Sequence, residues 1–219
     1  MKKNLTEIVF ILDESGSMHN LTEDTIGGFN SLIKKQKNEE GEAIVSTVMF
    51  SSNSRVLHDR VSLECINEIT EEDYCPGGST ALLDAVGGAI KHIGNIHKYA
   101  REEDVPEHTI FIITTDGMEN ASRNYDRKKV KKLIENQKEK YGWEFIFLGA
   151  NIDAAETAAD IGIDRETAVD YMADSVGTHT LFCSVASAVT NARMGIKNSK
   201  SSAWRADIDR DHTDRSGRR

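Results

Sequence analysis

The sequence feature that most constrains the fold is the stretch that begins at Ile8. Five consecutive apolar residues, Ile-Val-Phe-Ile-Leu, lead directly into the polar sequence Asp-Glu-Ser-Gly-Ser, which ends at Ser17. A short apolar run rich in β-branched residues favours a strand that is buried on both faces of a sheet. Parallel strands of open α/β sheets present ligand-binding groups at their carboxyl ends. We therefore expect the polar side chains of Asp13, Ser15 and Ser17 to form part of a binding site.

Apolar runs and helical periodicity alternate through the rest of the chain. Further strands are expected over residues 43–50, 55–62, 109–115, 145–150 and 168–172, and helices from about residues 22 and 82 and over residues 126–141, 153–161 and 176–194. The first two of these strands are separated by a short polar turn, which predicts a hairpin that adds one antiparallel strand at the sheet edge. The expected fold class is α/β, a Rossmann-like open, mostly parallel sheet with one antiparallel edge strand and helices on both faces.

Length and composition indicate one domain followed by a tail. A chain of 219 residues is long enough for one large domain, which we assign to residues 1–196. After this point the sequence becomes rich in Ser, Asp and Arg, and its only large apolar residues are Trp204 and Ile208. Because so few apolar groups do not compensate the entropy of ordering a chain, we expect residues 197–219 to be a mostly disordered tail.

Charge and cysteine usage argue against several classes of function. The net charge of −9 disfavours nonspecific binding to nucleic acid, which requires cationic side chains that neutralise phosphates. No apolar run approaches the ~18 residues of a membrane span, and no hydrophobic signal region follows the first residues. The three cysteines, Cys65, Cys75 and Cys183, show neither Cys-x-x-Cys nor zinc-ligand spacing. We therefore expect a cytoplasmic protein with reduced thiols that binds neither nucleic acid nor membranes.

Two further loops add oxygen donors to the first one. A tight Gly-Gly-Ser-Thr loop places Thr80 before an expected helix, and a later buried strand ends at Asp116. Together with Asp13, Ser15 and Ser17 they offer only carboxylate and hydroxyl oxygens, which favours Mg²⁺, Mn²⁺ or Ca²⁺ over zinc or copper. A helix cap or a turn would explain any one of these loops alone. Because all three combine, we interpret the five residues as one metal site with a position open to an outside acidic group.

Taken in order, these motifs resemble those of a von Willebrand factor type A domain with a metal-ion-dependent adhesion site. The pattern Asp-x-Ser-x-Ser, a loop threonine and a Thr-Asp-Gly sequence follow one another in this chain. The resemblance implies that Ser15 and Ser17 coordinate the metal directly and that Thr80 does so directly or through water. It also implies that Asp13 and Asp116 bind metal-held waters and orient the serines.

The same resemblance, which covers roughly residues 5–196, implies binding rather than catalysis. A Glu or Asp of a partner protein would complete the coordination of a bound Mg²⁺, and small bacterial-type members of the family often act as adaptors in multiprotein machinery. Asp84, one turn into the helix that follows Thr80, is a further candidate for a hydrogen bond to the site.

An enzymatic alternative is a Mg²⁺-dependent phosphatase-like hydrolase with Asp13 as its nucleophile. Phosphatases that resemble haloacid dehalogenases have a second acid two residues after the first and a lysine at a later strand end. Here Ser15 stands at the second position, and no lysine lies at an equivalent strand end. We therefore expect a divalent-metal-dependent protein-binding module that is not an enzyme.

Overall fold

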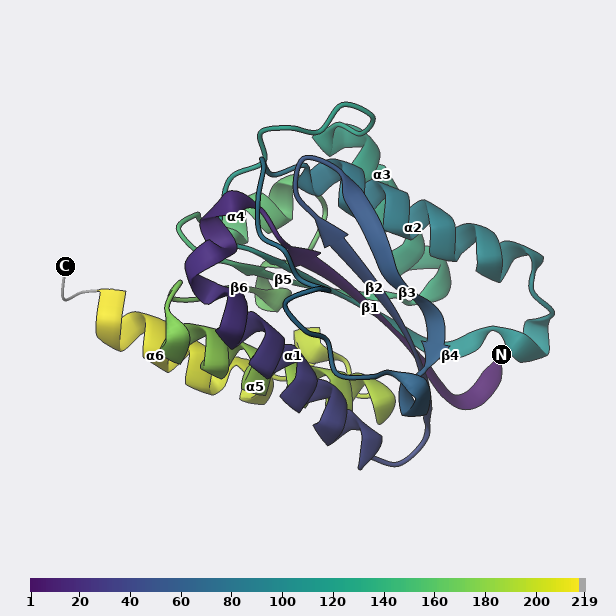
Figure 1. The fold of residues 1–219 in the computed structure, drawn as a ribbon. Helices are drawn as coiled ribbons and strands as arrows, with labels where there is room; N and C mark the ends of the chain where they lie inside the picture. The colour runs from purple at the N-terminus through teal and green to yellow at the C-terminus, as the bar shows by residue number, and fades with distance from the viewer. Residues whose placement is uncertain (217–219) are drawn as a thin grey trace.

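The computed structural model describes residues 1–216, which form one six-stranded sheet with helices on both faces (Figure 1). The strands are β1 (Lys2–Asp13), β2 (Glu42–Phe50), β3 (Ser54–Ser62), β4 (Pro106–Thr115), β5 (Glu144–Gly149) and β6 (Ala168–Asp170). The α-helices are α1 (Thr22–Lys37), α2 (Leu82–Tyr99), α3 (Arg127–Tyr141), α4 (Ala154–Asp160), α5 (Ser175–Arg193) and α6 (Ala206–Ser216). Short 3₁₀ segments join some of these elements.

The sheet has the strand order β3-β2-β1-β4-β5-β6. β1 runs parallel to both β2 and β4, and β5 and β6 continue the parallel arrangement. β3 pairs antiparallel with β2, so the two strands form the predicted hairpin at one edge. The predicted fold class, a Rossmann-like open sheet with one antiparallel edge strand, is therefore confirmed.

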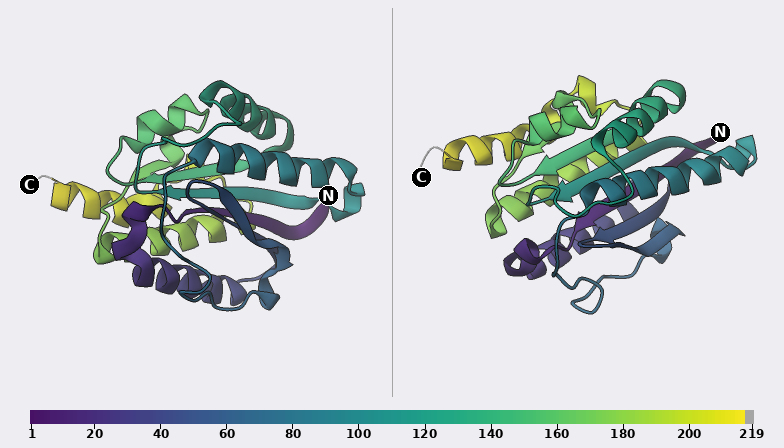
Figure 2. Two further views of the ribbon diagram at one scale, coloured as in Figure 1. Left: turned by 45° about the horizontal axis from the view of Figure 1, so that its top comes forward. Right: turned by 90° about the horizontal axis from the view of Figure 1, so that it is seen from above.

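Two apolar layers enclose β1 because its side chains alternate between the two faces of the sheet. Ile8, Phe10 and Leu12 belong to the core that α1, α5 and α6 cover, whereas Val9 and Ile11 belong to the core on the side of α2, α3 and α4. Figure 2 shows the same helices from two further directions. All five residues are buried, which explains why the strand is a continuous apolar run in the sequence.

The chain connections place the ends of β1 and β4 where the strand order reverses. From β1 the chain continues to β2 and β3 on one side, whereas β4 leads to β5 and β6 on the other. In open α/β sheets such a switch point leaves a crevice outside the carboxyl ends of the central strands. Asp13 and Thr115 end β1 and β4, so the loops that follow both strands border this crevice.

The prediction of a disordered tail is wrong for the part of it that the structure describes. Residues 206–216 form α6, which packs against α5. Trp204 and Ile208 are buried in the core beneath α5, and the indole N–H of Trp204 donates to the carbonyl of Asn198. The tail therefore extends the domain assigned to residues 1–196. Residues 217–219 of the predicted tail lie outside the described residues.

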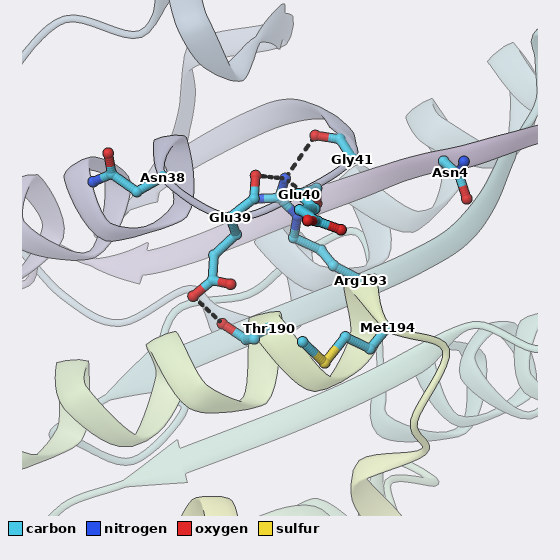
Figure 3. A pocket seen from close by; sticks show the side chains of 8 residues that line it. All are labelled: Asn4, Asn38, Glu39, Glu40, Gly41, Thr190, Arg193 and Met194. Carbon is cyan, nitrogen blue, oxygen red and sulfur yellow. Dashed lines mark hydrogen bonds between the residues drawn. The ribbon is translucent and has the colours of Figure 1, made fainter.

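Arg193 joins the last turns of α1 and α5 at the amino-end edge of the sheet (Figure 3). Its Nη1 donates to the carbonyl of Gln36 at 2.6 Å, and its Nη2 donates to those of Glu40 and Gly41 at 2.9 Å and 2.8 Å. Carbonyls at a helix C-terminus lack intrahelical partners, and a guanidinium satisfies several of them at once. Arg193, Glu40 and Gly41 also line a cavity of about 490 Å³.

No helix within residues 1–216 combines the length and the apolar character needed to cross a membrane.

Candidate metal centre

Asp13 connects the carboxyl ends of β1 and β4. Its side chain is 1% exposed. Oδ1 accepts a hydrogen bond from the backbone N–H of Ser15 at 2.7 Å, and Oδ2 accepts one from the hydroxyl of Thr115 at 2.6 Å. The carboxylate thus holds the first loop against the third one, and it has a fixed orientation before any ligand arrives.

The hydroxyls of the two serines form a chain that ends on the second carboxylate. Ser15 Oγ and Ser17 Oγ lie 3.1 Å apart, and Ser17 Oγ donates to Asp116 Oδ1 at 2.6 Å. Ser15 stands immediately before the 3₁₀ segment Gly16–Leu21, but its side chain makes no capping hydrogen bond. The hydroxyl of Ser15 therefore does not cap this segment, and helix capping does not explain the loop.

Thr80 brings the second loop to the same place. Its side chain is buried, and its backbone N–H and carbonyl both bind Asn120, at 2.9 Å and 3.0 Å. A Cβ added at Gly117 would lie 3.7 Å from Thr80 Oγ1 and 3.9 Å from Ser17 Oγ. The hydroxyls of two different loops therefore face the backbone of Gly117, directly after Asp116, and the five predicted ligands share one region.

Backbone hydrogen bonds fix the first two loops relative to each other. The N–H of Gly77 donates to the carbonyl of Glu14 at 2.8 Å, and the N–H of Gly16 donates to that of Gly78 at 3.2 Å. Gly78 has a φ of +80°, a left-handed conformation that favours glycine. Gly77 and Gly78 thus allow the backbone of the second loop to lie close to that of the first.

Burial determines the electrostatics of the two carboxylates. Burial raises the pKa of Asp13, and the charge of Asp116 adds to this, against hydrogen bonds from Ser15 and Thr115. Burial also raises the pKa of Asp116, which is 5% exposed, against a hydrogen bond from Ser17. Within residues 1–216, neither carboxylate forms an ion pair with a lysine, arginine or histidine. Buried charges in proteins are paired or coordinate metals, so two unpaired carboxylates fit a bound cation.

The donor atoms also fit the predicted class of metal. Hydroxyl and carboxylate oxygens are ligands of hard cations such as Mg²⁺. Across the described part of the chain, no group of three or more His, Cys, Asp and Glu side chains is placed so that it could hold a metal ion by itself. A metal here would depend on the hydroxyls as much as on the two carboxylates.

The comparisons with known proteins concern the fold. No family model and no curated protein sequence matches the chain. Among solved structures, proximal thread matrix protein 1 from the mussel byssus matches with a TM-score of 0.59 and 16% identity, over 85% of this chain and 46% of that one. A von Willebrand factor type A protein from Catenulispora acidiphila matches with a TM-score of 0.53 and 17% identity, over 87% of this chain and 42% of that one. The chain has the von Willebrand factor type A fold. It spans about half the length of these two structures.

Two further matching structures contain metal. The manganese-loaded TRAP protein of Plasmodium vivax aligns with a TM-score of 0.52 and 17% identity, over 74% of this chain and 64% of that one. A second structure of the mussel protein has a zinc-occupied metal-ion-dependent adhesion site and aligns with a TM-score of 0.56 and 15% identity, over 84% of this chain and 46% of that one.

The von Willebrand factor type A fold of this chain contains supporting residues that the sequence interpretation missed. The hydroxyl of Tyr74 donates to the carbonyl of Asp13 at 2.5 Å, and Asn120 holds Thr80 from the third loop. Burial raises the pKa of Tyr74, so its hydroxyl stays a neutral donor. Tyr74 belongs to an irregular acidic connection without periodicity, and no local pattern marks it.

Asp84 has a different role from the one considered for it. Its carboxylate accepts hydrogen bonds from the backbone N–H groups of Arg123, Asn124 and Tyr125, at 2.9, 2.9 and 2.8 Å. It therefore anchors the far part of the loop after β4 and has no hydrogen bond to the five predicted ligands. Glu119 ties the near part of the same loop to the start of α2 through the N–H of Leu83.

Proposed function

We propose that the chain is a divalent-metal-dependent protein-binding module, an adaptor that captures an acidic residue of a partner protein. Ser15, Ser17 and Thr80 would hold Mg²⁺ through their hydroxyls, and Asp13 and Asp116 would bind metal-held waters. The observation that supports this most strongly is the pair of buried carboxylates that form no ion pair with a cationic side chain of residues 1–216 and lie beside three convergent hydroxyls.

The hydroxyl ligands explain why we propose an acidic residue as the partner's binding group. Hydroxyls are neutral ligands, so a cation that they hold keeps much of its positive charge. An incoming Glu or Asp then gains a charge-assisted contact in a partly desolvated crevice. The metal-containing mussel and Plasmodium structures of the same fold support a divalent ion at this place, and we choose Mg²⁺ because the ligands are all oxygens.

A binding role also agrees better with the geometry than hydrolysis does. Both oxygens of Asp13 already accept hydrogen bonds, from Ser15 and Thr115. The alternative type of phosphatase needs an acid two residues after its nucleophile, and Ser15 stands at that position here. Within residues 1–216, no lysine forms an ion pair with Asp13. We therefore propose that the chain is not an enzyme.

Metal binding is tested with Mn²⁺, whose free ion gives an electron paramagnetic resonance signal that is lost on binding. We expect one Mn²⁺ per chain, displaced by Mg²⁺. The double substitution Ser15→Ala, Ser17→Ala should weaken binding about tenfold or more, because it removes two direct ligands. Ser79→Ala is the matched control, since Ser79 precedes Thr80 in the same loop and is exposed. Equal Mn²⁺ binding by the double variant and the wild type would contradict the proposed site.

Partner capture requires a second experiment. The tagged chain should retain a partner from native lysate in Mg²⁺ but not in EDTA, and Ser17→Ala should retain none. Exchange of one Glu or Asp of the recovered protein for its amide should abolish the interaction. Capture that is insensitive to EDTA would remove the support for metal-dependent binding, and Mg²⁺-dependent hydrolysis of a phosphate ester that Asp13→Ala abolishes would favour the hydrolase.

A further inference from the structure

Cationic side chains gather where the loop after β4 leads into α3. Residues 123–132 contain six lysines and arginines and a single carboxylate, that of Asp126. All six cations are exposed, although the chain as a whole has a net charge of −9. The function proposed above uses none of them. We call these six residues the basic cluster: Arg123, Arg127, Lys128, Lys129, Lys131 and Lys132.

Most of the basic cluster has no counter-charge. The guanidinium of Arg127 lies 3.5 Å from a carboxylate oxygen of Asp160, and the ammonium of Lys129 lies 3.9 Å from one of its neighbour in the N-cap. Both pairs are solvent-exposed, so they hold neither cation firmly. The other four cations form no ion pair within residues 1–216: Arg123, Lys128, Lys131 and Lys132.

The position of three of these cations is unfavourable for the helix itself. The amino end of an α-helix carries a partial positive charge, so acidic residues stabilise its first turn and cations destabilise it. The first turn of α3 contains Arg127, Lys128 and Lys129 and no acidic residue. The N-cap Asp126 accepts a hydrogen bond from the N–H of Lys129 at 2.8 Å and offsets part of this cost. Helix stability therefore does not explain why cations stand here, whereas a contact with a negatively charged partner would.

The neighbouring helix adds no free negative charge to this surface. α2 and α3 lie side by side over one face of the sheet (Figure 1), and their apolar residues share one core. The only carboxylate of α2 is that of Asp84, which the N–H groups of residues 123–125 bind. Lys91 of α2 is exposed, and the carboxylates of α3, those of Glu135 and Glu139, lie in its second half. The surface at the start of the two helices is therefore electropositive within an acidic protein.

The basic cluster borders the proposed metal centre. The N–H of Arg123 donates at 2.9 Å to Asp84, which stands one turn into the helix that follows Thr80. Asn120, in the same loop as Arg123, binds the backbone of Thr80 at 2.9 Å and 3.0 Å. This loop begins directly after β4, at Asp116. An extended peptide advances about 3.3 Å per residue, so a segment that reaches the metal centre continues over Arg123 onto α3 within a few residues.

The charge of the rest of the chain favours one kind of anionic partner. Nucleic acids and anionic membranes are extended, so beyond the cluster they face a chain whose net charge is −9. Single-stranded nucleic acid also stacks on exposed aromatic rings, and the only ring in residues 123–132 is that of Tyr125, which is partly buried. A short acidic peptide touches the cluster alone, because charges more than about 8 Å away are largely screened at physiological salt. Carboxylates are also the groups that the proposed metal centre would take.

We propose that the basic cluster binds an acidic segment of the partner protein, next to the residue that completes the metal site. One carboxylate of this segment contacts Arg123, and others contact Lys128 and Lys132, which stand one turn apart on the same face of α3. The place of the segment in the partner rests on the function proposed above, whereas its contacts with the cluster need no metal. The cluster thereby selects partners that carry several acidic residues close together.

A fluorescein-labelled octaglutamate peptide is the probe, and fluorescence anisotropy measures its binding to the full chain in EDTA and in Mg²⁺ at equal ionic strength. The double variant Lys128→Glu, Lys132→Glu should bind the peptide about tenfold more weakly than the wild type in both buffers. Glutamate is favoured in the first turn of a helix, so Lys128→Glu should leave α3 folded. Lys34→Glu, Lys35→Glu is the matched control, because these exposed lysines of α1 lie on the other face of the sheet and the net charge changes equally.

The outcomes separate the basic cluster from the metal centre. A wild type that does not bind the peptide, or equal binding by the two double variants, would overturn the proposal. Tighter binding of octathymidylate or of phosphatidylserine vesicles than of the peptide, at equal charge concentration, would also overturn it. Ser17→Ala should remove any gain from Mg²⁺ and leave the effect of the lysine substitutions unchanged. If Mg²⁺ does not tighten binding by the wild type but the lysine substitutions still weaken it, the metal centre fails and the basic cluster stands.

Discussion

Two buried carboxylates on β1, those of Glu7 and Asp13, have different partners. The carboxylate oxygens of Glu7 lie 2.7 Å from Nε of Arg60 and 2.5 Å from Nε2 of His97. The carboxylate of Asp13, at the end of the same strand, accepts hydrogen bonds from an N–H group and a hydroxyl. The charge of Asp116 contributes to raising the pKa of Asp13. Both side chains are buried to nearly the same extent.

The difference separates a charge that is compensated within the fold from one for which we propose a metal-binding role. A buried charge is costly unless a counter-charge or several hydrogen bonds compensate it. The chain supplies the counter-charge for Glu7 itself, so this residue contributes to the fold and needs no ligand. Within residues 1–216, no cationic side chain pairs with Asp13 or Asp116, which agrees with the cation site proposed for them.

Arginines reinforce this contrast between the two edges of the sheet. At the amino-end edge, Arg60 pairs with Glu7, and Arg193 binds the carbonyls at the end of α1 (Figure 3). Arg55 lies nearer the metal centre, but its guanidinium pairs with Glu14 and is thereby withdrawn from Asp13. At the carboxyl-end edge, no lysine, arginine or histidine of the described residues pairs with Asp13 or Asp116.

We expect the largest change in stability when Glu7 loses its ion-pair partner Arg60. Arg60→Met leaves Glu7 buried with His97 alone, and we expect it to lower the free energy of unfolding by about 3 kcal/mol. Urea denaturation at pH 7 measures the change. Arg101→Met is the matched control, because Arg101 pairs only with exposed carboxylates and its loss should leave stability unchanged. Equal stability of the two variants would show that Glu7 does not depend on Arg60.

The sequence was sufficient to predict the sheet because strands and tight turns are marked by local sequence patterns. Continuous apolar runs predicted the buried strands, and the short turn after Phe50 predicted the antiparallel edge. The five predicted ligands were found together for a related reason, since parallel strands present their carboxyl ends at one edge. Their role as metal ligands stays a prediction.

The parts that could not be predicted depend on contacts between distant segments. Trp204 and Ile208 are four residues apart and lie on one face of a helical segment, but the composition around them is that of a disordered chain. Their burial beneath α5 stabilises α6 against that composition. Tyr74 reaches Asp13 from an irregular connection, and no spacing rule predicts such a contact.

Asp84 tests whether hydrogen bonds alone can compensate a carboxylate. Burial alone would raise its pKa, but the N–H groups of Arg123, Tyr125 and Asn124 lower it overall. Asp84→Ala should cost about 2 kcal/mol of stability at pH 7, because three donors lose a charged acceptor that solvent partly screens. Since the folded pKa is the lower one, the contribution of Asp84 is present above its unfolded pKa and lost as the pH falls through its folded pKa.

Denaturation curves of the wild type and Asp84→Ala between pH 7 and pH 3 measure this contribution. The stability difference between the two proteins should shrink toward the acid end of the range. Hydrogen exchange at residues 123–125 should be faster in the variant at pH 7, while the exchange of β1 stays unchanged. A difference that does not vary with pH would mean that the charge of Asp84 is irrelevant and that only its packing matters.

The smallest expected change in the free energy of unfolding is a stabilisation, and it concerns Asp13 itself. In EDTA, Asp13→Asn should raise the free energy of unfolding by about 1 kcal/mol, because it removes a charge that burial disfavours. The amide preserves the local contacts: its oxygen accepts from Ser15 N–H, and its NH₂ donates to Thr115 Oγ1 in place of the present bond. Glu7→Gln is the matched control and should destabilise, since Arg60 and His97 lose their carboxylate. In excess Mg²⁺ the order should reverse, because bound metal stabilises only the wild type. If Asp13→Asn destabilises the chain in EDTA as Glu7→Gln does, both carboxylates are structural and the contrast along β1 fails.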